Sequence, residues 1–352
     1  MRVLMVGVDK QTKGGMWTVV ENYLHAEDFL QQVELDYVPT STTGSIAKRL
    51  RFTAAALVRI IANFLRWKYD IVHVHMSERG SVYRKNIVIS LAKLCSAKVI
   101  IHMHGAEFET WYRGLDEAKQ QGVRRILDKG DKILILGSYW LDFVQGLVEA
   151  PDRVTVLHNA VYVPEKNYYD LNSRQMLFLG VVGQRKGVFD LLEAVKRIDA
   201  ELPADVKLMI YGPENNCSIR EKINAMELSH RVEYGGWLSA GQKAEVFSQT
   251  AVNILPSYNE GLPMTILETM AYGIPNISTS VAAIPEAVNE TNGAVICAGD
   301  VEELGRQILG IMKDTAARAE KSSHAYKMAK DVFSVRYHVQ QLLEVYRELK
   351  HS

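Results

Sequence analysis

Residues 256–275 read PSYNEGLPMTILETMAYGIP, and two short apolar runs, Val252–Leu255 and Asn276–Ser278, enclose them. Parallel strands that are buried on both faces are short, continuous apolar runs, and helices connect them. We therefore expect a strand, a loop, a helix and a second strand here. Glu260 falls in the loop, and Glu268 follows on the helix with seven residues between them. The neighbours of Glu268 are apolar, which is an uncommon setting for a charge that only meets solvent.

The alternation of apolar runs and amphipathic segments continues in both directions from this stretch. A chain of 352 residues is about twice the usual domain size, so we predict an α/β protein with two doubly wound, Rossmann-like domains. The polar segment Tyr162–Gln175 interrupts the alternation, and we place the domain boundary at Pro164, between domains 1–163 and 164–332. The predicted strands are Val3–Val8, Leu35–Val38, Ile71–Val74, Val99–Met103, Ile133–Leu136, Val154–Leu157, Met176–Val182, Val206–Tyr211, Val232–Tyr234, Val252–Leu255, Asn276–Ser278 and Ala294–Cys297.

The composition excludes several classes of protein. Lysine plus arginine and aspartate plus glutamate both number 41, so the chain lacks the excess positive charge of a nucleic-acid-binding protein. The three cysteines are far apart and form no Cys-x-x-Cys pair, as is typical of reduced thiols. No apolar run approaches the roughly 20 residues of a membrane span, and the N-terminus lacks a signal-peptide core. We expect a soluble, cytoplasmic protein.

The charge is uneven along the chain. The segment Gly44–Lys98 carries eleven basic and two acidic residues. A helical projection of residues 46–68 separates an apolar face from a basic face. Two interpretations stay open: an ordinary outer helix with a solvated face, or a peripheral contact with anionic lipid head groups at the inner face of the cell membrane. The apolar face holds Leu50, Ala54, Leu57, Ile61 and Phe64, and the basic face holds Lys48, Arg51, Arg59 and Arg66.

A glycine pair follows the first predicted strand. Gly14 and Gly15 precede an apolar helix, and such a pair lets backbone amides approach a phosphate or a sugar. A tight turn explains the pair equally well. No predicted strand is followed by Gly-x-Gly-x-x-Gly, which argues against a nicotinamide-dependent dehydrogenase.

Histidines mark the third and fourth predicted strands. His104 lies where the fourth strand ends, so it can donate a hydrogen bond to a substrate hydroxyl or carry a proton, although a structural histidine remains the alternative. We expect His73 and His75 of the third strand to point to opposite faces of the sheet. Without acidic or cysteine ligands at a suitable spacing, we expect no metal site.

Two loops of the second domain suit a diphosphate. In Gly180–Gly187, the adjacent cations Arg185 and Lys186 precede a helix, although a solvated basic turn is the alternative. Between the two glutamates, backbone amides open the next helix, while the glutamates themselves can bind two polyols such as a sugar and a ribose. The donor-binding segment between the glutamates consists of Gly261, Leu262, Pro263, Met264 and Thr265.

Together these segments resemble the retaining glycosyltransferases of family four, which have the GT-B fold. The stretch from Glu260 to Pro275 is similar to the Glu-x7-Glu signature of that family. Supporting similarities span nearly the whole chain and are specific for the family, although they do not identify the sugar. They include Gly14-Gly15, His104-Gly105, Leu157-His158-Asn159-Ala160-Val161, Arg185-Lys186-Gly187, Tyr211-Gly212-Pro213, Tyr234-Gly235-Gly236 and Ile284-Pro285-Glu286.

The resemblance implies a bacterial enzyme of surface-polysaccharide synthesis, with a nucleotide-sugar-binding second domain and a C-terminal helix, 333–352, that crosses back to an acceptor-binding first domain. It implies a UDP-sugar donor, retention of anomeric configuration and no metal or other cofactor. By the same resemblance, Glu260 would bind the donor sugar, Glu268 the ribose and Lys186 the diphosphate. His104 would contact the sugar near its reacting carbon, Gly14 and Gly15 would lie by the acceptor and diphosphate, and Tyr234 and Trp237 would flank the base.

One position departs from the family. The family usually has an arginine directly after the glycine that ends the first strand of its second domain, and here that position is Val181. Arg185 can substitute for it from the other side of the loop. The leading interpretation is transfer of a hexose or N-acetylhexosamine to a lipid-linked glycan. A GT-B-like nucleotide-sugar epimerase and a catalytically silent scaffold are the alternatives, and Val181 motivates the latter.

Overall fold

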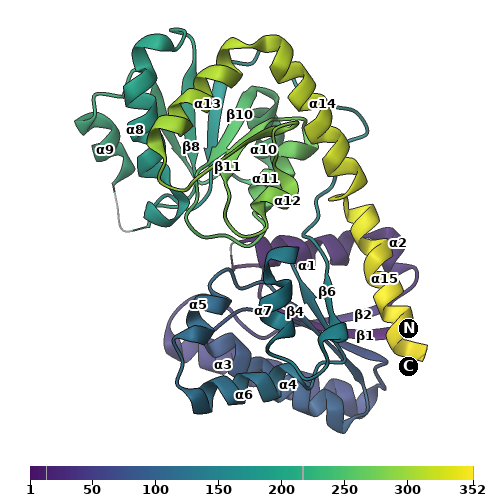
Figure 1. Ribbon diagram of the computed structural model, residues 1–352. Coiled ribbons are helices and arrows are strands. Elements are labelled where there is room, and N and C mark those ends of the chain that lie inside the picture. The colour runs from purple at the N-terminus through teal and green to yellow at the C-terminus, as the bar shows by residue number, and fades with distance from the viewer. Residues whose placement is uncertain (13, 216–217, 352) are drawn as a thin grey trace. The chain divides into compact units, whose positions relative to one another are not determined.

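The computed structural model describes residues 1–12, 14–215 and 218–351, and Figure 1 shows its helices and strands. The chain divides into two compact units. The first unit contains Met1–Ala160 and the C-terminal segment that begins at Val335, and the second contains Val161–Ser334. The chain leaves and re-enters the first unit at neighbouring points, because Val161 and Ser334 form an isolated parallel bridge. The predicted boundaries, after residues 163 and 332, lie close to these points.

Each unit has one parallel six-stranded sheet, and all twelve predicted strands are present. The predicted pair of Rossmann-like domains is therefore confirmed. The central strands β3 and β10 are buried along their whole length, as continuous apolar runs require. The strands are β1 (Arg2–Gly7), β2 (Glu34–Pro39), β3 (Ile71–Met76), β4 (Lys98–Met103), β5 (Lys132–Ile135), β6 (Val154–Val156), β7 (Gln175–Leu179), β8 (Lys207–Tyr211), β9 (Val232–Gly236), β10 (Thr250–Leu255), β11 (Asn276–Thr279) and β12 (Gly293–Ile296).

The strand order reverses once in each sheet. The first sheet has the order β2-β1-β3-β4-β5-β6, and the second has the order β12-β11-β10-β7-β8-β9. At the point of reversal, two loops leave neighbouring strands at their carboxyl ends, where ligands of such sheets bind. In the second sheet these are the loops after β7 and β10, which contain the predicted diphosphate and carboxylate residues.

Helices connect the strands (Figure 1). Among the described residues, no helix combines the length and apolar character that are needed to cross a lipid bilayer. The helices are α1 (Gly15–His25), α2 (Glu27–Leu30), α3 (Ile46–Arg66), α4 (Gly80–Leu94), α5 (Phe108–Arg113), α6 (Glu117–Leu127), α7 (Leu141–Gln145), α8 (Val188–Ile198), α9 (Ile219–Ala225), α10 (Ala240–Ser248), α11 (Met264–Ala271), α12 (Ile284–Ala287), α13 (Val301–Lys313), α14 (Thr315–Asp331) and α15 (Val335–His351).

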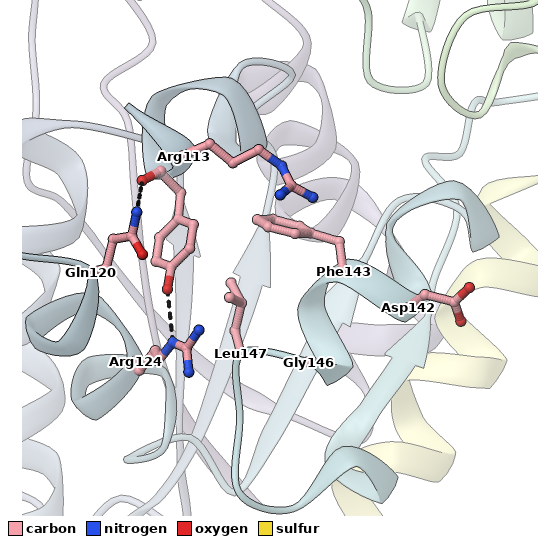
Figure 2. Close-up of a pocket in the computed structure, with 8 residues that line it drawn as sticks. Arg113, Gln120, Arg124, Asp142, Phe143, Gly146 and Leu147 are labelled. Atoms are coloured by element: carbon pink, nitrogen blue, oxygen red, sulfur yellow. Dashed lines mark hydrogen bonds between the residues drawn. The ribbon is translucent and has the colours of Figure 1, made fainter. Parts of the chain in front are cut away.

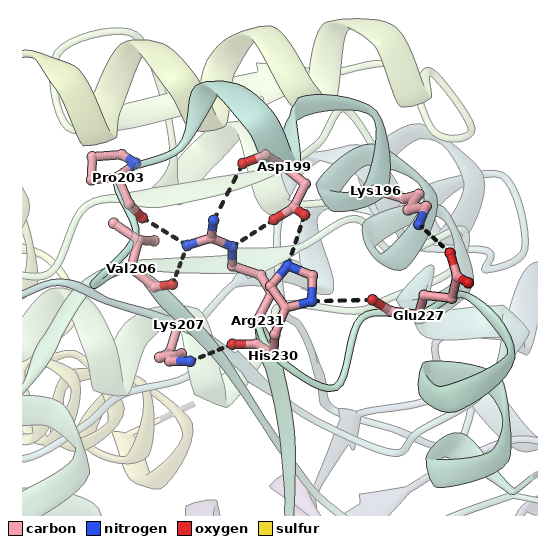
Figure 3. Close-up of polar contacts among 8 residues, drawn as sticks. All are labelled: Lys196, Asp199, Pro203, Val206, Lys207, Glu227, His230 and Arg231. Atoms are coloured by element: carbon pink, nitrogen blue, oxygen red, sulfur yellow. Dashed lines mark hydrogen bonds and ion pairs between the residues drawn. The ribbon is translucent and has the colours of Figure 1, made fainter.

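A buried arginine fixes the start of β9. The Nε atom of Arg231 donates to a carboxylate oxygen of Asp199 over 2.8 Å, and its other nitrogens donate to the carbonyl oxygens of Asp199, Pro203 and Val206 over 2.6 to 3.2 Å (Figure 3). Burial raises the pKa of Asp199, but the hydrogen bonds and charges of Arg231 and His230 outweigh it and leave the pKa below its ordinary value. The contacts anchor the start of β9, and at its other end the amide of Gly212 donates to the carbonyl of Gly236 over 2.7 Å.

Helix α3 does not bury the apolar face that its sequence suggests. The side chains of Leu50 and Ile61 are 66% and 44% exposed, and the buried residues are Ala56 and Ile60. Aliphatic residues occur around most of this helix, so two of its faces are apolar and periodicity alone does not identify the one that packs inward. The exposed face, which we call the apolar stripe, follows helical spacing beside the basic face and contains Ile46, Leu50, Ala54, Val58, Ile61 and Leu65.

Candidate active site

The carboxyl edge of the second sheet brings Lys186 and Glu260 together. Lys186 lies in the loop after β7, and Glu260 lies in the loop after β10. The ammonium of Lys186 forms an ion pair with Glu260, and the hydroxyl of Ser257 donates to the same carboxylate oxygen over 2.7 Å. The side chains of Lys186 and Glu260 are only 14% and 6% exposed. Buried charges are retained in proteins when they are paired and hydrogen-bonded, as this pair is.

Glycine at position 187 lets these two loops approach each other. Gly187 has a φ of +70°, and a Cβ atom there would lie 1.9 Å from the carbonyl oxygen of Pro256. Any other residue would combine backbone strain with a clash. The amide of Tyr258 donates to the carbonyl of Arg185 over 2.9 Å, and the guanidinium of Arg185 donates to the carbonyl of Asn259 over 2.8 Å. Arg185 is thus tied to the β10 loop twice.

Val181 lies in the same loop after β7. Its side chain is 38% exposed. The next residue, Val182, forms an isolated bridge with Glu214, and its amide donates to the carbonyl of Pro213 over 2.9 Å. The backbone on this side of the loop is therefore fixed, while the side chain at position 181 meets solvent.

The residues Gly261 to Thr265 lead into α11, where the sequence predicts that a helix begins. Gly261 and Leu262 lie in the turn, Pro263 occupies the N-cap position, and the helix begins at Met264. The first amides of a helix have no acceptor within the helix, and proline offers no side-chain acceptor for them. With the positive end of the helix dipole, these amides make the turn a suitable place for an anionic group.

Glu268 on α11 has a partner that sequence reasoning missed. The ammonium of Lys243, from α10, donates to both carboxylate oxygens of Glu268, each over 2.7 Å. The side chains of Lys243 and Glu268 are 29% and 16% exposed. The two residues are 25 positions apart and on different helices, so no local pattern could have paired them. The pair holds the Glu268 carboxylate in one orientation.

Tyr234 and Trp237 lie at the carboxyl end of β9. The hydroxyl of Tyr234 donates to the carbonyl of Gly212 over 2.8 Å, and the guanidinium of Arg220 lies 5.2 Å from the centre of its ring. Trp237 is 50% exposed. A Cβ atom at Gly212 would lie 1.7 Å from the carbonyl oxygen of Gly180, so the loops after β7 and β8 also touch. A half-exposed indole at this edge can stack on a planar ring.

The first unit holds Gly14, Gly15 and His104. Gly14 has a φ of +147°, directly before α1, so its backbone conformation favours glycine. The amide of His104 donates to the carbonyl of Met76 over 2.8 Å, which extends the pairing of β3 and β4 by one residue. The side chain of His104 is half-buried at this strand end.

In the first unit, sequence reasoning missed a buried lysine of α4. The ammonium of Lys85 donates to the hydroxyl of Thr40 over 2.6 Å and to the carbonyl of Gly7 over 3.2 Å. Its side chain is 1% exposed, and burial, followed by the charge of Arg84, lowers its pKa well below the ordinary value. Lys85 fastens the carboxyl ends of β1 and β2, next to the loop that leads to the glycine pair.

The prediction that His73 and His75 point to opposite faces is wrong. Side chains alternate along a strand, so residues two positions apart share a face. The rings of His73 and His75 stack with centres 4.7 Å apart. His102 lies opposite His75 in the register of β3 and β4, and its ring is 4.2 Å from that of His104. These four residues, His73, His75, His102 and His104, form what we call the histidine face.

Residues of α1 and α15 cover the histidine face. The hydroxyl of Tyr346 is 2.7 Å from Nδ1 of His73, and the ring of Tyr23 is 6.1 Å from that of His73. Tyr23 also bonds the imidazole of His338, whose Nδ1 donates to the carbonyl of His158 over 2.7 Å. Helix α15 therefore completes the core of the first unit.

Buried imidazoles resemble a metal site, so their spacing matters. Nitrogen atoms of His73, His75 and His102 lie within 4.8 Å of one another. Two ligands that are each about 2.1 Å from one ion can be at most about 4.2 Å apart, so a single ion would need all three nitrogens within that distance. Nε2 of His73 and Nδ1 of His102 are 3.2 Å apart. The absence of a metal site stays a prediction.

A separate pocket of about 460 Å³ opens on the first unit (Figure 2). Nε of Arg124 donates to the hydroxyl of Tyr112 over 2.8 Å, and the guanidinium of Arg113 lies 5.5 Å from the ring centre of Phe143. The predicted site residues do not line it, so the candidate site does not depend on it. Its lining residues are Tyr112, Arg113, Gln120, Arg124, Asp142, Phe143, Gly146 and Leu147.

Comparison with protein families assigns both units. Residues 164–329 match the family described as "Glycosyl transferases group 1", and residues 17–160 match the "Glycosyl transferase 4-like domain". Each match lies within one unit of the structure.

Two relatives of known source illustrate the similarity. An uncharacterized 41.2 kDa protein in the cps region of Klebsiella pneumoniae is 24% identical over 309 residues, which cover 81% of this chain and 83% of that protein. The UDP-Gal:alpha-D-GlcNAc-diphosphoundecaprenol alpha-1,3-galactosyltransferase of Escherichia coli is 24% identical over 317 residues, which cover 82% and 77%.

Solved structures share the fold. Sucrose-phosphate synthase from Thermosynechococcus elongatus superposes with a TM-score of 0.81 at 16% identity, covering 99% of both chains. The HepE protein of Anabaena in complex with UDP superposes with a TM-score of 0.77 at 14% identity, covering 99% of this chain and 100% of that one. With both units matched and the two-sheet fold shared, the chain belongs to the bacterial glycosyltransferases of the family-four type, which have the GT-B fold.

Proposed function

We propose that this glycosyltransferase moves a hexose or N-acetylhexosamine from a UDP-sugar to a glycan acceptor, with retention of anomeric configuration, in the synthesis of a bacterial surface polysaccharide. The observation that carries the proposal is the buried Lys186–Glu260 pair beside the start of α11. The pair puts a cation and a hydrogen-bond acceptor next to the first amides of α11, which are the groups that a sugar diphosphate needs. The UDP in the name of the Escherichia coli relative and the UDP bound to HepE support the choice of nucleotide.

Each residue of this edge has a task in the proposed reaction. Glu260 accepts hydrogen bonds from the donor sugar, and Lys186 with the amides of α11 stabilises the charge on the departing diphosphate. Glu268 accepts hydrogen bonds from the ribose, and Trp237 stacks on the base. In the front-face mechanism that we propose, the leaving phosphate oxygen takes the acceptor proton, so the reaction needs no carboxylate nucleophile. Because cations and amides of the chain supply the countercharge, we propose that transfer needs no metal.

Because position 181 is a valine, another residue must supply the positive charge of the family's usual arginine, and Arg185 is the candidate. The loop after β7 carries Arg185 and Lys186 in sequence, and the backbone and guanidinium of Arg185 are bonded to the β10 loop. We propose that Arg185 replaces the family's usual arginine at the diphosphate. Loss of one charged contact without such a replacement would cost about 1.5 to 3 kcal/mol.

We propose that the acceptor is lipid-linked and that α3 brings the enzyme to an anionic membrane surface. The apolar stripe of α3 includes Val58 and Leu65, which are 67% and 85% exposed. The basic face, with Arg59 and Arg66, lies beside it on the same helix. An exposed apolar row next to cations fits the boundary between lipid head groups and acyl chains. The diphosphoundecaprenol in the name of the Escherichia coli relative supports such an acceptor.

The proposed transfer is tested by incubating the protein with UDP-sugars, with and without a lipid-linked glycan acceptor. Release of UDP only with the acceptor, together with a glycoside of the donor's anomeric configuration, supports the proposal. Interconversion of free nucleotide sugars without transfer would identify an epimerase, and no turnover with any donor would identify a silent scaffold. Product formation in the presence of EDTA tests the proposed metal independence separately.

The membrane contact is tested by sedimentation with liposomes at low and high salt. We expect binding to anionic vesicles, none to zwitterionic vesicles, and weaker binding as salt screens the charges. Replacing Arg59 and Arg66 by glutamate should abolish binding and reduce transfer to a lipid-linked acceptor, without changing binding of free UDP. The same change at Lys327 and Lys330, which are exposed on α14 of the second unit, is the matched control. Binding that ignores salt would contradict the electrostatic part of the proposal.

A further inference from the structure

The histidine face contains two separate hydrogen-bonded strings. In the first, Nδ1 of His75 and Nε2 of His104 are 2.8 Å apart. In the second, Nδ1 of His102 bonds Nε2 of His73 over 3.2 Å, and Nδ1 of His73 bonds the hydroxyl of Tyr346 over 2.7 Å. The first string ends at the half-buried His104, which follows β4, whereas the second ends at Tyr346 inside the core.

Each string begins at a histidine whose Nε2 atom lies outside the string, and this atom determines where the protons of the string lie. Within residues 1–12, 14–215 and 218–351, the buried Nε2 atoms of His75 and His102 have no hydrogen-bond partner. A neutral imidazole carries one proton, on either Nδ1 or Nε2. A buried N–H without an acceptor is rarer in proteins than a buried acceptor without a donor. The protons of His75 and His102 therefore belong on Nδ1, the nitrogen that has a partner.

The proton of His75 then sets the tautomer of His104. If Nδ1 of His75 donates, Nε2 of His104 must accept. The single proton of neutral His104 is left on its Nδ1, which is free to donate to a bound molecule. Burial lowers the pKa of both His75 and His104 below the ordinary value of 6.5, so both rings are neutral at pH 7. His75 is buried completely, so solvent does not compete for this bond.

We propose that His75 is a positioning residue that holds His104 as an Nδ1–H donor toward the hydroxyl of a sugar. The proposal rests on the proposed function, because it takes His104 to face a sugar substrate. It assigns His73 no part in this, since His73 belongs to the other string and bonds Tyr346. A residue that replaces His75 can keep this role only if its side chain has an N–H near the position of Nδ1. Asparagine has such an N–H, and leucine does not.

The tautomer is measured directly by nitrogen NMR on protein labelled in histidine, without substrate. We expect His104 to carry its proton on Nδ1 in the wild-type protein, with His104→Gln used to assign the signal. In His75→Leu the proton should move to Nε2 or exchange between both positions, and in His75→Asn it should stay on Nδ1. A His104 proton on Nε2 in the wild type overturns the proposal, and so does an unchanged tautomer in His75→Leu.

Kinetics provide the second readout. With a UDP-sugar and a glycan acceptor, His75→Leu should lower kcat about 10-fold, the effect of one hydrogen bond, while KM for the donor changes little. His75→Asn should restore most of kcat, and His73→Leu, the matched control on the same strand, should keep the wild-type kcat. An equal fall of kcat in His73→Leu would mean that both histidines only support the core, and would overturn the proposal.

Failure of the function and failure of this inference have different signatures. If the wild-type protein transfers no sugar, the proposed function fails, and the NMR result still decides whether His75 sets the His104 tautomer. Elemental analysis of protein without a histidine tag tests whether the histidines bind a metal ion instead. One equivalent of bound transition metal that is lost in His75→Leu would mean that Nε2 of His75 binds an ion, which would overturn the tautomer assignment.

Discussion

The two units have the same type of sheet but place different chemistry on it. In the first unit, neutral imidazoles line β3 and β4, and their hydrogen-bond partners are other imidazoles and the hydroxyl of Tyr346. In the second, the partners form ion pairs: Lys186 with Glu260 in the loops after β7 and β10, and Lys243 with Glu268 between α10 and α11. A diphosphate demands countercharge, whereas a sugar hydroxyl is bound by neutral donors and acceptors. The difference is what we expect if the second unit binds the nucleotide and the first presents a sugar.

The largest effect that we expect is a loss of folding stability at low pH, and we expect it in the first unit only. Unfolded histidine has a pKa near 6.5, and burial lowers the pKa of His73 to about 3 and of His338 to about 4. Below pH 6.5 the unfolded chain binds more protons, so stability is full above that pH and falls as the pH drops. At pH 5 these two residues together cost about 4 kcal/mol.

Urea unfolding at pH 7.5 and pH 5, followed by hydrogen exchange in each sheet, checks this. We expect β3 and β4 to lose protection at pH 5 while β7 and β10 keep theirs. The second unit offers the control, because His230 and His324, its histidines in the described part of the chain, are exposed. Equal losses in both sheets would mean that the histidine face does not determine the acid sensitivity.

The next effect tests the charged edge. Glu260→Gln and Lys186→Ala should each reduce transfer by at least about 100-fold and leave the fold intact, because both contacts strengthen as the diphosphate departs. Steady-state kinetics, with circular dichroism for the fold, measure this. Glu245→Gln, an exposed carboxylate of α10, is the matched control and should have no effect. Near-normal activity of both site variants would remove this edge from the catalytic site.

A smaller effect concerns the second ion pair. Glu268→Gln should weaken UDP binding about 10-fold, because a carboxylate is a stronger acceptor for ribose hydroxyls than an amide. Lys243→Met should weaken it about threefold, since Glu268 loses the partner that orients it. Isothermal titration with UDP measures both. Tighter binding in Lys243→Met would show instead that Lys243 competes with the ribose.

The smallest effect is at Val181. Its side chain is exposed in the loop that holds Lys186, so Val181→Arg adds a cation without displacing core residues. We expect donor binding to stay the same or to improve. Val181→Leu is the control for added bulk, and UDP-sugar titration of both variants compares them. Marked weakening in Val181→Arg alone would show that this loop binds the donor differently from that of other family members.

Much of the fold could be predicted from the sequence, because continuous apolar runs identify buried parallel strands. The sequence located Lys186 and Glu260 in loops that follow strands of the second domain, but it did not pair them; they meet because β7 and β10 are neighbours in the sheet. The pairing of Lys243 with Glu268 could not be found this way, because it depends on the packing of α10 beside α11. The inward face of α3 could not be predicted either, since aliphatic residues occur around most of the helix and two of its faces are apolar.

The histidine face is a different case, because its signal was present. The motifs His73-Val74-His75 and His102-Met103-His104 repeat with the period of a strand, and strand alternation places each pair on one face. The sequence does not predict which residues cover the histidine face. Tyr346 and His338 come from the end of the chain, far from β3 in sequence, and only the folded unit brings them together.

The passage of α15 into the first unit affects how the protein is made. A ribosome completes β1 to β6 before the second unit, whereas Tyr346 and His338 are made only after it. Domains usually fold as they are synthesised, the N-terminal one first. Here the first unit stays incomplete until α15 has been made, and until then Tyr23 and the histidine face lack the cover of that helix. The nascent chain therefore exposes that surface throughout synthesis of the second unit, and a premature stop codon shortly before α15 would harm the half that was translated first.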